Sequence, residues 1–132
     1  MNATGSVLLD TTIVVDHLRS KSPSLDERFK ETTTLYLPVT VLGELLYGVY
    51  KSAFEAKSLK QVEDFIQLCA ILGTDERTAH YYGRIHADLT RLGKPIPQND
   101  IWIAAIALEH NLPLATRDQH FSFVSGLTLL EW

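Results

Sequence analysis

The sequence predicts an α/β fold in which helices flank a central parallel β-sheet, an α/β/α sandwich. Short apolar runs alternate along the chain with longer segments of helical apolar spacing, and strands that alternate with helices are typical of parallel sheets. Prolines and glycines stand singly at the ends of these segments, and there is no internal repeat or Gly/Ser linker. We therefore expect residues 1–132 to form one domain.

In the first part of the chain, an apolar run ends at an acid and a helical pattern follows. We expect a buried strand at residues 6–10 and a helix over residues 12–19, with Thr11 or Thr12 at its N-cap. Residues 20–31 predict a second, short helix, because Ser24 is a favourable N-cap and acids follow it at the helix start.

The next segments predict two further strands separated by helices. A strand at residues 34–38 ends at a proline, and Thr40 is placed to cap a helix whose apolar spacing continues to Val49. A helix over residues 58–68 follows, with Cys69 expected on its apolar face, and the brief run at residues 70–72 predicts a third strand.

The last part of the chain predicts two helices and two strands. A long helix over residues 75–92 ends at Gly93, a residue that tolerates the left-handed backbone of a helix C-terminus. The helix over residues 99–111 is apolar without interruption in its centre, which implies burial on more than one face. Short strands are expected at residues 112–116 and 127–132.

Composition and charge limit the classes to which this chain can belong. It is 45% hydrophobic and 21% charged, as in an ordinary globular domain. No apolar run approaches the roughly 18 residues of a membrane helix, and the N-terminus lacks the basic start of a signal peptide, so we expect a cytoplasmic protein. The net charge of −4 argues against bulk attraction to nucleic acid, but a metal ion could still hold a nucleic-acid substrate locally. The single Cys69 can form no internal disulfide and is assigned to packing.

Four acids map to the carboxyl edge of the predicted sheet, where ligands of open parallel sheets bind. Asp10 ends the first strand, Glu44 lies in the first turns of the helix after the second strand, Asp100 begins the penultimate helix, and Asp118 follows the strand that ends at Thr116. The sequence separates these acids widely, and the topology is expected to gather them.

Taken singly, three of these acids have ordinary explanations. Asp10 and Asp118 could be turn formers, and Asp100 could complement a helix dipole. Glu44 is harder to explain, because it lies within the apolar segment TVLGELLYGV, where an ionised carboxylate is costly unless it is paired or bound to metal. Four gathered carboxylates repel one another unless a cation lies between them. Oxygen ligands favour Mg²⁺ or Mn²⁺ over zinc or copper, and such an ion also accepts phosphate oxygens, which indicates phosphoryl chemistry.

Histidines and aromatic side chains offer weaker sites. His80 and His86 do not share a helix face, no HExxH spacing occurs, and the remaining histidines are isolated in the sequence (His17, His110, His120). We expect surface or packing roles for them. We likewise expect packing or interface roles, rather than base stacking, for the aromatic residues Tyr47, Tyr81, Tyr82 and Trp102.

Four segments together carry a family resemblance. LLDTT, TVLGELLYG, PIPQNDIWIAA and LATRDQHFSFVSGLTLLEW, in this order and spacing, resemble the PIN domain, specifically the VapC-type toxins of bacterial toxin–antitoxin pairs. The resemblance covers nearly the whole chain. Carried over by position, the acids of that family fall on Asp10, Glu44, Asp100 and Asp118, and Thr116 matches a hydroxyl frequent beside that site.

The resemblance implies an endoribonuclease that depends on Mg²⁺ or Mn²⁺, hydrolyses phosphodiester bonds in RNA such as tRNA or rRNA, and so arrests translation. It also implies a homodimer and a cognate antitoxin, whose C-terminal segment crosses the acidic groove and whose N-terminal part binds operator DNA. As a hypothesis, Asp10, Asp100 and Asp118 hold one or two ions, and Glu44 completes the shell or orients the attacking water. Three basic residues are candidates for contacts to the RNA backbone: Arg84, Lys94 and Arg117. For each of them we expect a solvated surface charge more than such a contact.

Two alternatives remain. Phosphohydrolases of the haloacid dehalogenase type also begin with an acid after the first strand, but they need a second acid two residues later, where this chain has Thr12. A non-catalytic PIN-like subunit, whose acids only dock an antitoxin within a DNA-binding complex, is the stronger alternative.

Overall fold

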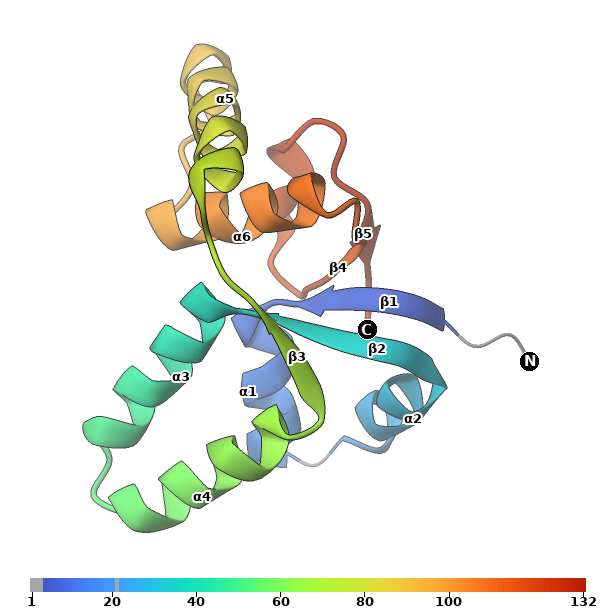
Figure 1. Ribbon diagram of the computed structural model, residues 1–132, viewed down its shortest axis with the longest axis vertical. Helices are drawn as coiled ribbons and strands as arrows, with labels where there is room; N and C mark the ends of the chain where they lie inside the picture. Colours follow the sequence, from blue (N-terminus) through green and yellow to red (C-terminus); the bar gives the residue numbers. More distant parts are fainter. Residues whose placement is uncertain (1–3, 21) are drawn as a thin grey trace.

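The computed structural model describes residues 4–20 and 22–132 (Figure 1). Its elements follow one another as β1 (Thr4–Leu9), α1 (Thr11–Ser20), α2 (Pro23–Glu31), β2 (Thr32–Pro38), α3 (Val39–Tyr50), α4 (Glu55–Ile66), β3 (Cys69–Leu72), α5 (Glu76–Leu92), α6 (Gln98–Glu109), β4 (Leu114–Ala115), the 3-10 helix η1 (Gln119–Phe123) and β5 (Leu129–Leu130).

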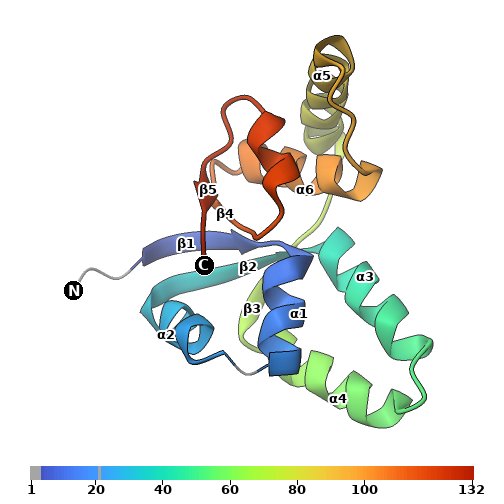
Figure 2. The same cartoon turned by 180° about the vertical axis from the view of Figure 1, so that it is seen from behind.

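The five strands form one parallel sheet in the order β3-β2-β1-β4-β5. The chain moves from β1 to β3 in one direction along the sheet and then returns past β2 and β1 to reach β4. Because crossovers between parallel strands are right-handed, this reversal places α1 to α4 on one face and α5 and α6 on the other. Figures 1 and 2 show the two groups of helices below and above the sheet. The predicted α/β/α sandwich is confirmed.

The core forms around the central strand and around α6. Val7, Leu8 and Leu9 of β1 are fully buried, because a parallel strand with helices on both faces has no solvent side. In α6, Ile101 and every residue from 103 to 107 are buried, so the expectation that this helix is covered on more than one face is confirmed. Within the described residues, no helix is both long and apolar enough to cross a membrane.

Both ends of α5 follow the sequence prediction. Asp75 is its N-cap and forms a capping box with Thr78, whose backbone N–H and hydroxyl both hydrogen-bond the Asp75 side chain. Gly93 ends the helix with a φ of 66°, a left-handed conformation that costs glycine little because it has no Cβ.

Three expected N-caps differ in the structure. Ser22, not Ser24, caps α2, because Pro23 occupies the first helical position and moves the cap one residue before it. The helix α3 begins directly after Pro38, so Thr40 lies in its first turn and makes no capping bond. The helix α1 already begins at Thr11, and the Thr12 hydroxyl donates to the Asp10 side chain.

The outer strands also differ in length or position. β4 and β5 contain two residues each and are shorter than the predicted segments 112–116 and 127–132. Each of them pairs with its neighbouring strand at only two positions. Cys69 begins β3 and does not continue the helix before it. Burial raises the pKa of the Cys69 thiol to about 12, which keeps it protonated and fits the packing role expected for it.

Candidate active site

The strand order changes direction at β1 and β4, which are parallel neighbours in the sheet. The connection after β1 leads to β2 and the one after β4 leads to β5, on opposite sides of this pair. In open parallel sheets a crevice forms at such a point, outside the carboxyl ends of the strands. Figures 1 and 2 show the first turns of α1, α3 and α6 converging at this edge.

All four predicted acids line one cavity at this edge. The cavity has a volume of about 490 Å³ and is lined by Asp10, Thr11, Thr12, Val15, Asp16, Glu44, Asp100, Arg117 and Asp118. Asp10 follows β1, Asp118 follows β4, and Glu44 and Asp100 come from the first two turns of α3 and α6. The structure therefore brings together residues that lie up to 108 positions apart in the sequence.

Two threonine hydroxyls hold Asp10 in place. Asp10 is only 3% exposed, and its Oδ2 accepts hydrogen bonds from Thr116 Oγ1 at 2.7 Å and from Thr12 Oγ1 at 2.9 Å. Thr116 Oγ1 also accepts a bond from the Asp118 backbone N–H at 3.0 Å. Thr116 therefore links the first acid to the turn that carries the fourth.

His120 lies beside Asp118, and its side chain is 60% exposed, as expected for a surface residue. Asp118 Oδ1 accepts a bond from the His120 backbone N–H at 2.9 Å and lies 3.1 Å from His120 Nδ1. The tight 3-10 turn η1 folds this imidazole back onto the acid two residues before it. A histidine two residues after an acid in a turn is the sequence pattern that could have indicated this pair.

Asp100 and Glu44 hold their protons more tightly than isolated acids. Burial is the largest cause of the raised pKa of Asp100, which reaches about 6, and the charges of the other three acids raise it further while His120 lowers it. Burial is also the main cause of the raised pKa of Glu44; the charge of Asp10 adds to it, and the polar groups of Thr11 and Asn99 lower it. The negative charges of these carboxylates therefore oppose one another in the cavity.

A divalent cation would compensate this repulsion. Glu44 Oε1 is buried and has no hydrogen-bond partner, a costly state for a carboxylate oxygen that a cation relieves. The cavity offers several carboxylate oxygens, ligands that suit Mg²⁺ or Mn²⁺, and its one lining arginine, Arg117, is paired with Asp16. In residues 4–20 and 22–132, no three His, Cys, Asp or Glu side chains already stand in an arrangement that could hold an ion. The chemistry of the carboxylate donors nevertheless suits a hard cation.

A fifth acid, Asp16, was missed by the sequence analysis. Its carboxylate pairs with Arg117 Nη1, while Arg117 Nε donates to the Trp132 carbonyl at 2.9 Å and the Arg117 backbone N–H donates to Thr12 Oγ1 at 3.1 Å. Arg117 therefore connects the turn after β4 to Asp16 in α1 and to Trp132, which follows β5. Asp16 lies four residues after Thr12, on the same face of α1, and this spacing is the pattern that could have revealed it.

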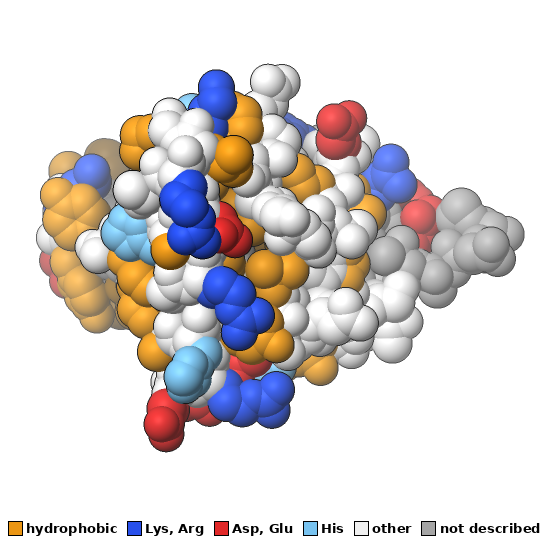
Figure 3. Space-filling view, turned by 90° about the horizontal axis from the view of Figure 1, so that it is seen from above, with side chains coloured by type: hydrophobic (Ala, Val, Ile, Leu, Met, Phe, Trp, Pro, Cys, Tyr) orange, Lys and Arg blue, Asp and Glu red, His pale blue; other side chains and the backbone are white. Residues whose placement is uncertain are grey.

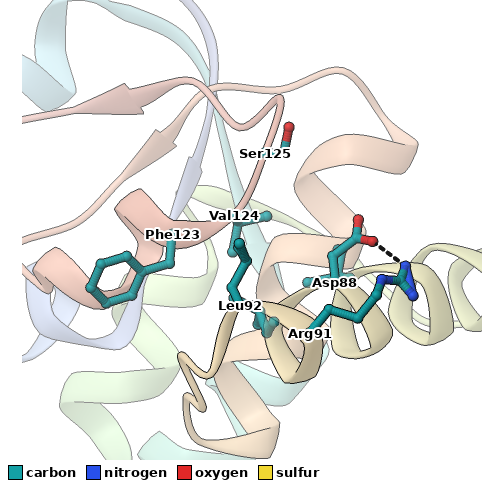
Figure 4. A pocket seen from close by; sticks show the side chains of 8 residues that line it. Asp88, Arg91, Leu92, Phe123, Val124 and Ser125 are labelled. Atoms are coloured by element: carbon teal, nitrogen blue, oxygen red, sulfur yellow. Dashed lines mark hydrogen bonds and ion pairs between the residues drawn. The ribbon is translucent and has the colours of Figure 1, made fainter.

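A second cleft lies away from the acids, between α5 and the segment after η1 (Figure 4). It has a volume of about 310 Å³, and its lining includes the apolar side chains Leu92, Phe123 and Val124. Its charged groups, Asp88 and Arg91, pair with each other at 2.6 Å. This cleft lacks the unpaired acids of the first cavity, so we place the active site at the carboxyl edge.

Comparison with known proteins gives consistent matches. A family model, the PIN domain, matches residues 7–127. The chain is 32% identical over 127 residues to the tRNA(fMet)-specific endonuclease VapC of Shigella flexneri, a match that covers 95% of this chain and 96% of that protein. It is 31% identical to ribonuclease VapC2 of Haemophilus influenzae, with the same coverage of 95% and 96%.

Solved structures give the same result. DNA-bound VapBC from Salmonella typhimurium matches with a TM-score of 0.92 at 30% identity, covering 100% of this chain and 99% of that one. VapBC2 from Rickettsia felis, bound to a DNA fragment from its promoter, matches with a TM-score of 0.91 at 27% identity, covering 96% and 98%. Each similarity extends over nearly the full length of both chains.

Proposed function

The chain belongs to the PIN domain family, among the VapC ribonucleases, and on that premise we propose that it is a Mg²⁺- or Mn²⁺-dependent endoribonuclease, the toxin of a toxin–antitoxin pair. The observation that carries the proposal is the cavity lined by Asp10, Glu44, Asp100 and Asp118, in which burial and neighbouring carboxylates raise the pKa values of Glu44 and Asp100. The relatives are ribonucleases by name, which favours the enzyme over a non-catalytic docking subunit.

The acids have distinct roles in the proposed hydrolysis. Asp10, Asp100 and Asp118 would hold the cation, which when bound would activate a water and neutralise charge on the phosphate. Thr116 and Thr12 fix the Asp10 carboxylate, so that its free oxygen faces the cavity in one orientation. Glu44 orients the attacking water through Oε1. The water oxygen bonds to phosphorus as the P–O3′ bond breaks. The water loses one proton to the surrounding solvent and O3′ gains one from it, so one water is consumed and the products are a 5′ phosphate and a 3′ hydroxyl.

The RNA backbone needs basic groups, which the net charge of −4 does not supply in bulk. The helix α5 carries exposed arginines at intervals of seven residues, Arg77, Arg84 and Arg91. Figure 3 shows Lys and Arg side chains in a row on the upper face of the molecule, where α5 lies in Figure 1. Arg84 and Lys94 stay candidates for phosphate contacts, and Arg117 serves first as the partner of Asp16.

The proposed partners are a cognate antitoxin and a second copy of the chain. Among the relatives, VapC occurs in VapBC complexes, two of them bound to DNA. A groove of about 380 Å³ between α1, α3 and α4 adjoins the acid cavity, with which it shares Thr11, Val15 and Glu44. We assign this groove to the antitoxin's C-terminal segment, with operator DNA bound only through the antitoxin. A homodimer in the cytoplasm completes the proposal.

The proposal is tested by RNA cleavage with purified protein. Wild type with added magnesium should cleave RNA, chelation with EDTA should stop the reaction, and Asp10→Asn should be inactive while it keeps the wild-type circular dichroism spectrum. Induced expression in a bacterial host should arrest growth, and Asp10→Asn should relieve the arrest. Undiminished cleavage by folded Asp10→Asn would show that the acids have another role.

A further inference from the structure

A polar cavity adjoins the acid site on its α3 side. It has a volume of about 510 Å³ and is lined by Thr11, Thr40, Gly43, Glu44, Tyr47 and Asn99. Glu44 and Thr11 line both this cavity and the acid cavity, so the two spaces meet at these residues. A ligand that lies across the acids can therefore extend one of its groups into the second space.

The wall of this cavity contains unused hydrogen-bonding capacity. Among the described residues, four buried side-chain atoms lack a hydrogen bond of good geometry, and three of them belong to residues lining this cavity: Thr11 Oγ1, Thr40 Oγ1 and Glu44 Oε1. The Thr11 and Asn99 side chains lie near enough to the Glu44 carboxylate to lower its pKa, so Thr40 Oγ1 is the clearest unpaired group of this wall. Buried polar atoms are almost always paired, because an unpaired one costs the free energy of its desolvation. Their concentration in one cavity indicates that a polar ligand completes it.

Tyr47 supplies an aromatic surface at the mouth of the cavity. It lies three residues after Glu44 in α3, and its side chain is 67% exposed, so it is not a core residue. Lys51 Nζ stands 4.8 Å from the centre of the Tyr47 ring and adds a positive charge. An exposed ring beside polar hydrogen-bonding groups is the combination by which proteins bind the splayed bases of single-stranded RNA.

We infer that this cavity binds one base of the RNA next to the scissile phosphodiester, an inference that rests on the proposed nuclease function. The Tyr47 ring stacks on the base, and the Thr11 and Thr40 hydroxyls and the Asn99 amide hydrogen-bond its edge. Hydroxyl and amide groups both donate and accept, so they match the mixed donor and acceptor pattern of a base edge. An apolar protein side chain in the same place would leave the hydroxyls unpaired.

Cleavage kinetics with single-stranded RNA oligonucleotides and magnesium test the stacking. Tyr47→Ala should raise KM about tenfold, as expected for the loss of one base–aromatic stack, and leave kcat nearly unchanged. Tyr47→Trp should restore KM. The matched control is Tyr50→Ala, which removes a side chain that is 60% exposed on the same helix but lines neither cavity, and its KM should equal that of wild type.

Base preference tests the hydrogen bonds. Cleavage of a randomised oligonucleotide pool by Thr40→Val should lose its preference at one position beside the cut, and only there. The Tm of Thr40→Val should not fall, because the substitution removes a hydroxyl that has no partner in the protein. A lowered Tm with an unchanged base preference would show a structural role for Thr40 and would overturn the inference.

Two further outcomes separate this inference from the function on which it rests. If wild type cleaves RNA and Asp10→Asn does not, but Tyr47→Ala and Thr40→Val match wild type in KM and base preference, the nuclease stands and the base site is wrong. The base site is equally wrong if Tyr47→Ala weakens only binding of the coexpressed antitoxin. If wild type cleaves no RNA, both fail.

Discussion

The molecule contains two acid clusters bridged by a threonine, and they behave in opposite ways. At the start of α5, the Thr78 hydroxyl lies 2.6 Å from Glu109 Oε1 and 3.2 Å from Asp75 Oδ1. At the carboxyl edge, Thr116 links Asp10 to the turn of Asp118. The Thr78 backbone N–H is the main reason why the pKa of Asp75 is lowered, whereas burial and neighbouring charges raise that of Asp100.

The difference lies in how many carboxylates share one buried space. Around Asp75 the Thr78 backbone N–H and hydroxyl bind the carboxylate, so the cluster stabilises the helix start without any ligand. Around Asp100 burial and the charges of three other acids raise its pKa, and Glu44 keeps an unpaired buried oxygen. A satisfied cluster serves the fold, and an unsatisfied one is prepared for a cation or substrate.

The largest expected effect is on the rate of RNA cleavage, which should depend on the acids at the carboxyl edge and not on the acids at the start of α5. Asp100→Asn should lower the rate of RNA cleavage by about 10²–10³-fold, because it removes a charged group from the reacting centre. Glu109→Gln, the matched change in the α5 cluster, should cleave at the wild-type rate. Rates per folded molecule, measured with magnesium, check the pair. Equal losses in both variants would show that the two clusters do not differ in function.

A smaller effect is expected from the two bridging threonines. Thr116→Val should lower cleavage by about 10–100-fold, since it frees a ligand carboxylate from its orienting hydrogen bond. Thr78→Val should leave cleavage unchanged and lower the free energy of unfolding by about 1 kcal/mol, the usual cost of a lost hydrogen bond at a cap. Urea unfolding and cleavage assays on both variants give the comparison; loss of activity in Thr78→Val would contradict it.

The smallest effect concerns pH and stability without metal. Between pH 3.8 and about 6, Asp100 is ionised in the unfolded chain but still protonated in the folded protein, so the folded state binds more protons and loses stability as pH rises. Asp75 acts in the opposite direction, because its lowered pKa makes stability fall only as pH drops below 3.8. The Tm in EDTA should therefore fall more from pH 4 to 6 in wild type than in Asp100→Asn, and magnesium should reduce this fall. Identical pH profiles of the two proteins would argue against a shifted Asp100.

The sequence predicted the fold and the four acids because both depend on the order of elements. Parallel strands bring their carboxyl ends to one edge, so an acid that follows a strand is placed there whatever its neighbours. Glu44 was recognisable from its apolar surroundings alone. Each acid lines the cavity in the structure, whereas their role as metal ligands stays a prediction.

Features that depend on packing between distant segments could not be predicted in this way. The pairing of Asp16 with Arg117 joins residues 101 positions apart and depends on how α1 meets the turn after β4. Thr40 matched the N-cap preference, but Pro38 already fixes the backbone at the start of α3, and the hydroxyl faces the polar cavity instead. Tyr47 was assigned a packing or interface role, and at 67% exposure it is not a core residue.

The hydrogen bond between Thr116 and Asp10 spans 106 residues and sets the order in which activity can arise during synthesis. A nascent chain folds from its N-terminus, so Asp10 and Glu44 leave the ribosome long before β4, Thr116 and Asp118 do. Until that last segment emerges, the first acid lacks the hydroxyl that orients it and the fourth is missing. The four-acid cavity can therefore form only after the residues of β4 and the turn at Asp118 have been synthesised.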